Sequence, residues 1–191
     1  MRLKDKVAII TGAGHGMGEA EACLFAQEGA RVMVADILGG EAERVAAEIR
    51  NTGGEASAAT IDVTSEPQWK ALIAKTLQTY GRVEILVNNA GISGSSVGDP
   101  DGIDGWNKVI AVNQTSVFLG TKLAAEEMAK SGGGAIVNTA RSWGLSAAPA
   151  ATPLIAPRRA RCGSIQRRRR CAMGRSAFGS TASIPATCRR C

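Results

Sequence analysis

Three glycines that follow a short apolar run have the spacing of a phosphate-binding turn. Gly12, Gly16 and Gly18 come directly after residues 7–10, whose sequence Val-Ala-Ile-Ile predicts a buried strand. Glycine lets the main chain come close to a pyrophosphate. The free N–H groups at the start of the following helix then attract the anion. The stretch therefore predicts a nucleotide-binding turn between a strand and a helix.

The spacing is G-x-x-x-G-x-G and differs from the dinucleotide pattern G-x-G-x-x-G. Met17 stands where the last glycine of that pattern would be. His15, the only histidine of the chain, lies in the same turn. We interpret His15 as a loop residue beside the phosphate, and neither as a metal ligand nor as a catalytic base.

An acidic residue ends the second apolar run. Residues 31–35 predict a strand, and Asp36 follows it about 20 positions beyond the glycines, with Ile37 next to it. A carboxylate there can bind both hydroxyls of a ribose, and its charge repels a 2′-phosphate. We therefore predict NAD, in preference to NADP, as the cofactor. The alternative is a solvated aspartate in a strand-to-helix loop.

Length and composition fit one α/β domain. The chain has 191 residues, of which 45% are hydrophobic, enough for a real core. No apolar run approaches the roughly 20 residues of a membrane span, so no membrane partner is expected. The first six residues lack the pattern of a signal peptide. We expect a cytoplasmic protein.

The net charge of +6 conceals two different compositions. Residues 1–153 hold 13 Lys and Arg against 17 Asp and Glu, whereas residues 154–191 hold ten Arg and no acidic residue. We predict an NAD-binding domain over 1–153 and an aberrant, disordered basic tail over 154–191. Arg167–Arg170 could form a nucleic-acid arm, but few aromatic residues accompany it, so no specific nucleic acid is expected. The four tail cysteines are irregularly spaced, and no metal site is predicted.

Strands and helices alternate along the first part of the chain. Strands are predicted over residues 7–11, 31–35, 55–61, 83–87 and 135–139, and helices over 16–29, 41–50, 66–80 and 106–130. Ser65 is expected to cap the third helix. This alternation predicts a Rossmann-type, doubly wound parallel sheet with right-handed crossovers. Its C-terminal strands and helices would be missing or replaced by the tail.

Four segments, in this order, resemble the short-chain dehydrogenase/reductase family. They are Thr11 to Gly18, Asp62-Val63, Asn88-Asn89-Ala90-Gly91 and Val112-Asn113. The resemblance covers residues 3 to about 153. It implies that Asp62 and Val63 lie beside the adenine, and that Asn89, Ala90 and Gly91 line the cofactor. Intact members of the family form homo-oligomers.

Two more segments are similar to bacterial NAD-dependent secondary-alcohol and cyclic-alcohol dehydrogenases of this family. They are Gly120-Thr121-Lys122 and Gly134 to Asn138. The resemblance implies hydride transfer between the nicotinamide and the carbinol or carbonyl carbon of a small alcohol or ketone. Substrate selectivity would lie in the loop over residues 93–105 and in a lid that this chain lacks.

The family catalyses this reaction with Ser, Tyr, Lys and Asn side chains. Asn113 matches the Asn, although it could also be a polar helix residue bonded to a kinked main chain. The Ser position holds Arg141, which cannot accept a hydrogen bond, and Ser142 beside it could serve with an offset of one residue. The only tyrosine, Tyr80, is expected in the core. Near position 154, where the family has its Tyr-x-x-x-Lys segment, the chain has Leu154.

A shifted reading frame would explain the tail. Possible codons from Leu154 onward, read two bases late, can encode Tyr-Ser-Ala-Ser-Lys, and the region of Ser176 to Arg189 can then encode the family's next strand and its Pro-Gly. We therefore infer a frameshift near Pro153 in an NAD-dependent oxidoreductase of this family, inactive as written. The alternative is a non-catalytic nucleotide-binding remnant whose tail binds polyanions without specificity.

Overall fold

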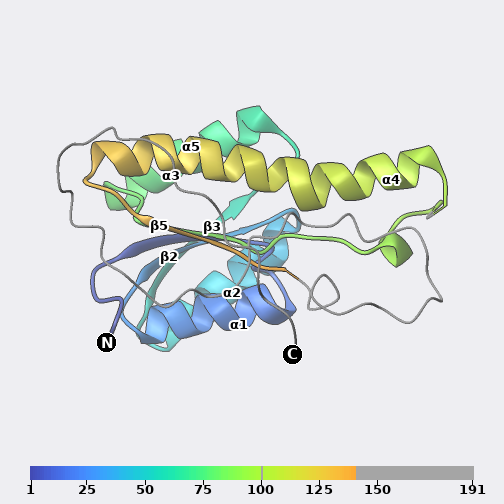
Figure 1. Ribbon diagram of the computed structural model, residues 1–191. Coiled ribbons are helices and arrows are strands. Elements are labelled where there is room, and N and C mark those ends of the chain that lie inside the picture. Colours follow the sequence, from blue (N-terminus) through green and yellow to red (C-terminus); the bar gives the residue numbers. More distant parts are fainter. Residues whose placement is uncertain (100, 141–191) are drawn as a thin grey trace, which may run out of the picture.

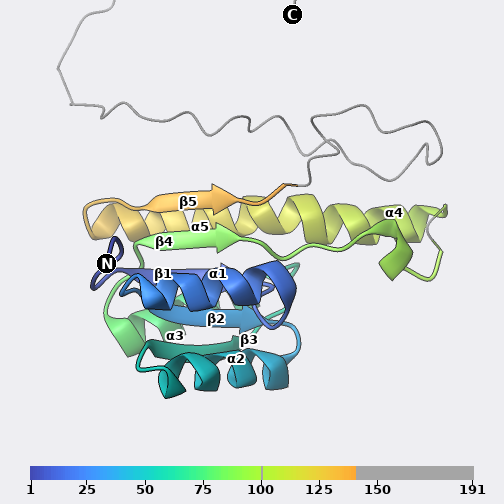
Figure 2. The ribbon, with the colours of Figure 1, turned by 90° about the horizontal axis from the view of Figure 1, so that it is seen from below.

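The computed structural model describes residues 1–99 and 101–140. Within them, five parallel strands form one sheet in the order β3-β2-β1-β4-β5, and all five arrowheads point the same way (Figure 2). The strands are β1 (Val7–Thr11), β2 (Arg31–Asp36), β3 (Glu55–Thr60), β4 (Ile85–Asn88) and β5 (Ala135–Asn138). The chain winds outward from β1 to β3 and then returns to the other side of β1. This is the predicted Rossmann-type topology.

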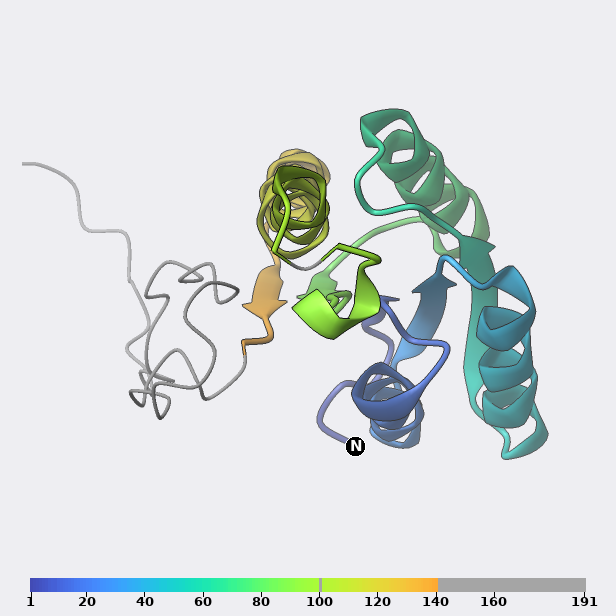
Figure 3. The ribbon, with the colours of Figure 1, turned by 90° about the vertical axis from the view of Figure 1, so that its right-hand side faces the viewer.

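Helices cover both faces of the sheet. They are α1 (Gly16–Gln27), α2 (Gly39–Asn51), α3 (Glu66–Tyr80), α4 (Ile103–Ile110) and α5 (Ser116–Lys130), with a 3₁₀ turn at Gly94–Ser96 and a π-helical segment at Ala111–Thr115. Helices α1 and α2 lie on one face, whereas α3 and α5 lie on the other (Figures 1 and 3). Within the described ranges, no helix has both the length and the apolar content that a membrane span needs.

The core forms two layers because successive residues of a strand point to opposite faces. In β1, Ile9 belongs to a buried cluster that also contains Trp69 of α3 and Leu123 of α5. Its neighbour Ile10 belongs to a second cluster on the other face, which contains Val45 of α2. Both isoleucines are fully buried. Strands buried on both faces read as continuous apolar runs, as residues 7–10 do.

Several element boundaries differ from the sequence prediction, most of them by one or two residues. The first helix ends at Gln27 and not at residue 29, because Gly29 has a φ of +90° and leaves the helix. The fourth strand covers Ile85–Asn88, two residues later at its start than predicted. Ser65 precedes α3, but its side chain makes no capping hydrogen bond.

The predicted helix over 106–130 begins earlier and is not continuous. It starts at Ile103, and the π-helical segment Ala111–Thr115 separates α4 from α5. Such a segment inserts an extra residue into a helical turn and often lies at a functional site. Asn113, the predicted catalytic asparagine, is its central residue.

The parallel strands bring the predicted cofactor residues to one edge of the sheet. The glycine turn follows β1, and Asp36 is the last residue of β2. Asp62 and Val63 follow β3, and Asn89 follows β4. Strands β1 and β4 are neighbours although β2 and β3 come between them in the sequence. Ligands of open parallel sheets bind outside the carboxyl ends of the strands at such a point.

Candidate functional site

Two glycines of the turn are required by close packing. Gly12 has a φ of +64°, and a Cβ built on it would lie 2.8 Å from the Ala90 Cα. A Cβ on Gly18 would lie 2.2 Å from the Gly12 carbonyl oxygen and 2.5 Å from Asn89 Nδ2. The turn therefore packs directly against the loop after β4, with no room for a side chain at either position.

The third predicted glycine has a different surrounding. Gly16 has a φ of +59°, and no atom lies within 4 Å of a Cβ built on it. It is the first residue of α1, and no side chain caps this helix start. The first N–H groups of a helix lack partners within the helix and favour an anion. Met17, in the first turn, is 61% exposed. The start of α1 is thus suited to hold a phosphate.

His15 lies at the edge of this turn. It precedes α1 with an extended main chain, and its Nε2 lies 3.5 Å from Oε2 of Glu41 on α2. Among residues 1–99 and 101–140, no group of three or more His, Cys, Asp or Glu side chains could hold a metal ion. A role of His15 beside a phosphate stays a prediction.

Asp36 connects the end of β2 to the glycine turn. Its side chain is buried, with 8% of its surface exposed. Oδ2 accepts a hydrogen bond of 2.9 Å from the Gly14 N–H, and Oδ1 accepts one of 2.9 Å from the Leu38 N–H. A carboxylate offers about four acceptor positions. Each oxygen of Asp36 therefore keeps one position for a hydroxyl group, which fits the two hydroxyls of a ribose. Ile37, next to it, is exposed.

The end of β4 is fastened to the glycine turn by side-chain and main-chain hydrogen bonds. Asn89 Nδ2 donates to the carbonyl oxygens of Thr11 and Gly12, both at 3.1 Å. Thr11 Oγ1 accepts from the N–H groups of Asn89 and Ala90, both at 3.1 Å. These bonds hold Asn89 and Ala90 beside the turn, and the role of residues 89–91 in lining the cofactor stays a prediction.

Asn88 joins three elements on the other side of β4. Its Nδ2 donates to Asn138 Oδ1 of β5 at 2.9 Å and to Thr121 Oγ1 of α5 at 3.3 Å. Asn88 itself is buried. Asn88 therefore links β4 to β5 and to α5.

Asp62 and Val63 form a tight turn after β3. Asp62 Oδ1 accepts hydrogen bonds from the N–H of Thr64 at 2.9 Å and from its hydroxyl at 2.7 Å. The Val63 carbonyl accepts from Trp69 Nε1 at 2.8 Å. The loop is thus anchored to α3, and it lies at the same sheet edge as Asp36.

Asn113 contacts the loop after β4. Its Oδ1 accepts from the Ile92 N–H at 2.8 Å, and its Nδ2 donates to the Ile92 carbonyl at 2.7 Å. Its side chain is therefore bonded to the main chain of this loop. Whether Asn113 also takes part in catalysis stays a prediction.

Comparison with known proteins assigns this chain to a family. The sequence model described as short chain dehydrogenase matches residues 6–157. The chain belongs to the short-chain dehydrogenase family. The match spans all described strands and helices, and it ends near Pro153, where the composition changes.

Two curated short-chain dehydrogenases are more than a third identical to this chain over the residues that match. A 2,5-dichloro-2,5-cyclohexadiene-1,4-diol dehydrogenase of Sphingobium indicum is 44% identical over 144 residues, which are 75% of this chain and 58% of that protein. Cyclopentanol dehydrogenase of Comamonas sp. is 38% identical over 150 residues, which are 78% of this chain and 60% of that protein. The chain therefore spans little more than half the length of these relatives.

A solved short-chain dehydrogenase has the same fold. A 7α-hydroxysteroid dehydrogenase, complexed with NADH and 7-oxo glycochenodeoxycholic acid, superposes with a TM-score of 0.71 at 39% identity. The match covers 76% of this chain and 56% of that one. The Rossmann-type architecture predicted from the sequence is thus confirmed.

None of the other residues considered for catalysis lies at this edge of the sheet within the described ranges. Arg141 and Ser142, the two candidates for the Ser position, lie outside the described residues, as do Leu154 and the basic tail. Tyr80 is buried, and its hydroxyl lies 3.0 Å from Ser57 Oγ and 3.4 Å from the Val32 carbonyl. Val32 is near the start of β2, away from the carboxyl ends of the strands. Tyr80 therefore packs in the core, as predicted, and cannot reach this site.

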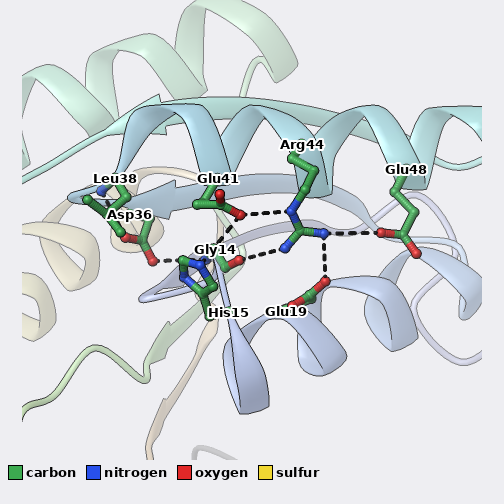
Figure 4. A network of polar contacts seen from close by, with 8 residues as sticks. All are labelled: Gly14, His15, Glu19, Asp36, Leu38, Glu41, Arg44 and Glu48. Carbon is green, nitrogen blue, oxygen red and sulfur yellow. Dashed lines mark hydrogen bonds and ion pairs between the residues drawn. The ribbon is translucent and has the colours of Figure 1, made fainter.

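The sequence reasoning missed Arg44, which braces the glycine turn (Figure 4). Arg44 Nη2 donates to the Gly14 carbonyl at 2.9 Å, and Nη1 donates to Glu19 Oε1 of α1 at 2.9 Å. Nε donates to Glu41 Oε2 at 2.8 Å, and Glu48 lies 3.5 Å from Nη1. The spacing of Glu41, Arg44 and Glu48 along one helix could have predicted the ion pairs within α2. The contacts of Arg44 with Gly14 and Glu19 could not be predicted from spacing, because they join separate elements.

Arg44 also stabilises the charged form of two of its partners. Its hydrogen bonds hold the pKa of Glu19 and the pKa of Glu41 below the ordinary value of a glutamate. The same bonds raise the pKa of Arg44. All of these groups are therefore charged near neutral pH, and the corner beside Asp36 carries more negative than positive charge.

Proposed function

We propose that this site binds NAD and that the protein is an NAD-dependent oxidoreductase acting on a secondary alcohol or the corresponding ketone. The observation that carries the proposal is the buried Asp36 carboxylate, which accepts one hydrogen bond from the glycine turn and keeps acceptor positions for a ribose. The solved relative complexed with NADH supports it. Bound NAD would supply the hydride acceptor.

The residues of the sheet edge fit the parts of NAD in order. Gly12, Gly16, Met17 and Gly18, with His15 beside them, would hold the pyrophosphate at the start of α1. Asp36 would hold the adenosine ribose, with Ile37, Asp62 and Val63 on the adenine side. Asn89, Ala90 and Gly91 would line the path toward the nicotinamide.

The preference for NAD over NADP is the finer part of the proposal. Asp36 offers no positive charge to a 2′-phosphate, and Glu41 lies near it, since a Cβ on Gly14 would lie 3.0 Å from both the Asp36 Cγ and the Glu41 Cβ. Two carboxylates would repel the phosphate. NADP should therefore bind more weakly than NAD.

The substrate class rests on the relatives. Two of them act, by name, on cyclic secondary alcohols, namely cyclopentanol and a cyclohexadiene diol. We propose a small alcohol of this kind as the substrate of the intact enzyme. We further propose that the intact enzyme is a cytoplasmic homo-oligomer. Asn113, together with Ser142 or its neighbour Arg141, would belong to the catalytic group.

A second candidate is a nucleotide-binding protein without turnover. It is favoured by Tyr80, because the only tyrosine of the sequence is bonded within the core. We propose that the 191-residue chain binds NAD without oxidising alcohols, and that the oxidoreductase activity belongs to the protein with its reading frame restored. A frame restored at codon 154 would return the Tyr-x-x-x-Lys segment and with it the activity. The basic tail would bind polyanions only non-specifically.

Calorimetry with the full chain tests the proposal. NAD should bind, NADP should bind at least about tenfold more weakly, and Asp36→Ala should remove most of the difference. Equal affinity of the two nucleotides, or no binding of NAD, would contradict it. The 191-residue chain and the frame-restored chain are each mixed with cyclopentanol and NAD. Only the frame-restored chain should produce NADH. Turnover by the 191-residue chain would exclude the second candidate.

A further inference from the structure

Both main-chain groups of Gly14 are held by charged side chains from α2 and β2. Its N–H donates to Asp36 Oδ2 at 2.9 Å, and its carbonyl accepts from Arg44 Nη2 at 2.9 Å (Figure 4). A glycine has more main-chain freedom than any other residue. These two bonds therefore decide how Gly14 is oriented and whether its N–H points at Asp36.

Arg44 is itself fixed from several directions. Nε is bonded to Glu41 at 2.8 Å and Nη1 to Glu19 at 2.9 Å, while Nη2 reaches Gly14. A guanidinium is a planar fork that can hold partners on different sides at once, whereas an ammonium is a point charge. The fork joins α1, α2 and the glycine turn into one unit.

We propose that Arg44 is a positioning residue for the cofactor site, which acts through Gly14 to hold the Asp36 carboxylate toward the ribose. This inference rests on the proposed binding of NAD. Without Arg44, Gly14 loses one of its two restraints, and the Asp36 carboxylate loses the fixed N–H that orients it. Ribose binding then has to order these groups, which lowers the affinity.

The chain offers a matched control on the same helix. Arg50 is 44% exposed against 45% for Arg44. Arg50 also pairs with a carboxylate, Glu43 at 2.6 Å, and donates to a main-chain carbonyl, that of Ala56 at 3.0 Å. Arg50 lies near the C-terminal end of α2, and neither of these contacts involves the glycine turn. Arg50→Gln therefore reproduces the structural loss without touching Gly14.

The experiment measures NAD affinity of the full chain by calorimetry. Arg44→Gln should weaken NAD binding about tenfold, and Arg50→Gln less than about twofold. Arg44→Lys keeps the positive charge but not the planar guanidinium, so it should lose most of the same NAD affinity. Because it is the more conservative change, it also serves as the second variant if Arg44→Gln does not fold. When Asp36 is already replaced by alanine, adding Arg44→Gln should lower the NAD affinity by less than about twofold, because Arg44 acts through Asp36.

The outcomes separate this inference from the proposed function. Absence of NAD binding by the unaltered chain would overturn both. NAD binding that Arg44→Gln leaves unchanged, or weakens as much as Arg50→Gln does, would overturn the positioning role alone. The same conclusion would follow if the loss from Arg44→Gln were equally large with Asp36 removed.

Discussion

Asn113 and Ile92 exchange two hydrogen bonds between a side-chain amide and a main chain. The amide of Asn113 donates to the Ile92 carbonyl at 2.7 Å and accepts from the Ile92 N–H at 2.8 Å. Asn113 is the centre of the π-helical segment Ala111–Thr115. The pair therefore links the irregular part of the long helix to the loop that leaves β4 beside the glycine turn.

Replacing Asn113 should destabilise the protein. Asn113→Ala removes both bonds and leaves two part-buried main-chain groups of Ile92 without them. We expect a loss of about 1–2 kcal/mol in the free energy of unfolding, measured by urea denaturation. Gln114→Ala, at an exposed position of the same segment, should change it by less than about 0.5 kcal/mol. Equal effects of the two variants would contradict a special role of the Asn113 bonds.

Gly18 should tolerate no side chain. A Cβ there would lie 2.2 Å from the Gly12 carbonyl oxygen, which is main chain and cannot move aside cheaply. We expect Gly18→Ala to cost about 2–3 kcal/mol and to abolish NAD binding. Gly40→Ala is the matched control, because nothing lies within 4 Å of its Cβ and its φ is not positive. It should be neutral or slightly stabilising. A stable, NAD-binding Gly18→Ala chain would contradict the packing of the turn.

Nucleotide preference should depend on two carboxylates. Asp36→Ser removes the charge nearest to a 2′-phosphate, yet Glu41 would still repel the phosphate and still hold Arg44. Adding Glu41→Gln weakens that hold and frees the guanidinium to pair with an anion. We expect the double variant to bind NADP about tenfold more tightly than Asp36→Ser does, as titrated by calorimetry. Glu43→Gln, on the same helix but paired with Arg50, should add nothing. The same NADP affinity with and without Glu41→Gln would contradict this account.

The contribution of Arg44 to stability should depend on pH. The pKa of Glu19 and that of Glu41 are lowered in the folded protein by their hydrogen bonds to Arg44. A lowered folded-state pKa gives stability above the unfolded value near 4.3, which is lost as the pH falls through the folded pKa. The unaltered chain should therefore exceed Arg44→Gln in urea midpoint at neutral pH, and the gap should close in acid below about pH 4. A gap that persists there would contradict the ion pairs as its source.

Local spacing was sufficient to predict the part of the site that one turn provides. The glycines and Asp36 follow buried strands, so their place at the carboxyl edge follows from the parallel order alone. The role of Asn89 came instead from the family resemblance, which implies that it lines the cofactor, and the structure bonds Asn89 to Thr11 and Gly12.

Contacts between distant segments could not be predicted in this way. At the interruption of the long helix, Asn113 is bonded to Ile92, which lies 21 residues earlier. The brace on Gly14 depends on α1 and α2 packing side by side, so that Glu19 and Arg44 meet. Helical periodicity gives each face of a helix, but not which neighbour that face will contact.

Glu21 has the opposite surroundings from Glu19, although both lie on α1. Its Oε2 is buried and has no hydrogen-bond partner within residues 1–99 and 101–140. Burial raises the pKa of Glu21. A raised folded-state pKa means that the folded chain holds this proton more tightly than the unfolded chain. The stability that goes with it is present in acid and is lost as the pH rises through the folded pKa.

Glu21→Gln should therefore stabilise the protein at neutral pH. The amide carries no charge to desolvate, and we expect a gain of up to about 1 kcal/mol in the free energy of unfolding, since Glu21 is only part-buried. The gain should shrink as the pH falls toward about 4, where Glu21 is protonated in the unaltered chain as well. Glu55→Gln, at an exposed position, should show neither effect. Urea denaturation at both pH values decides the matter, and a less stable Glu21→Gln chain at neutral pH would mean that the carboxylate has a stabilising partner.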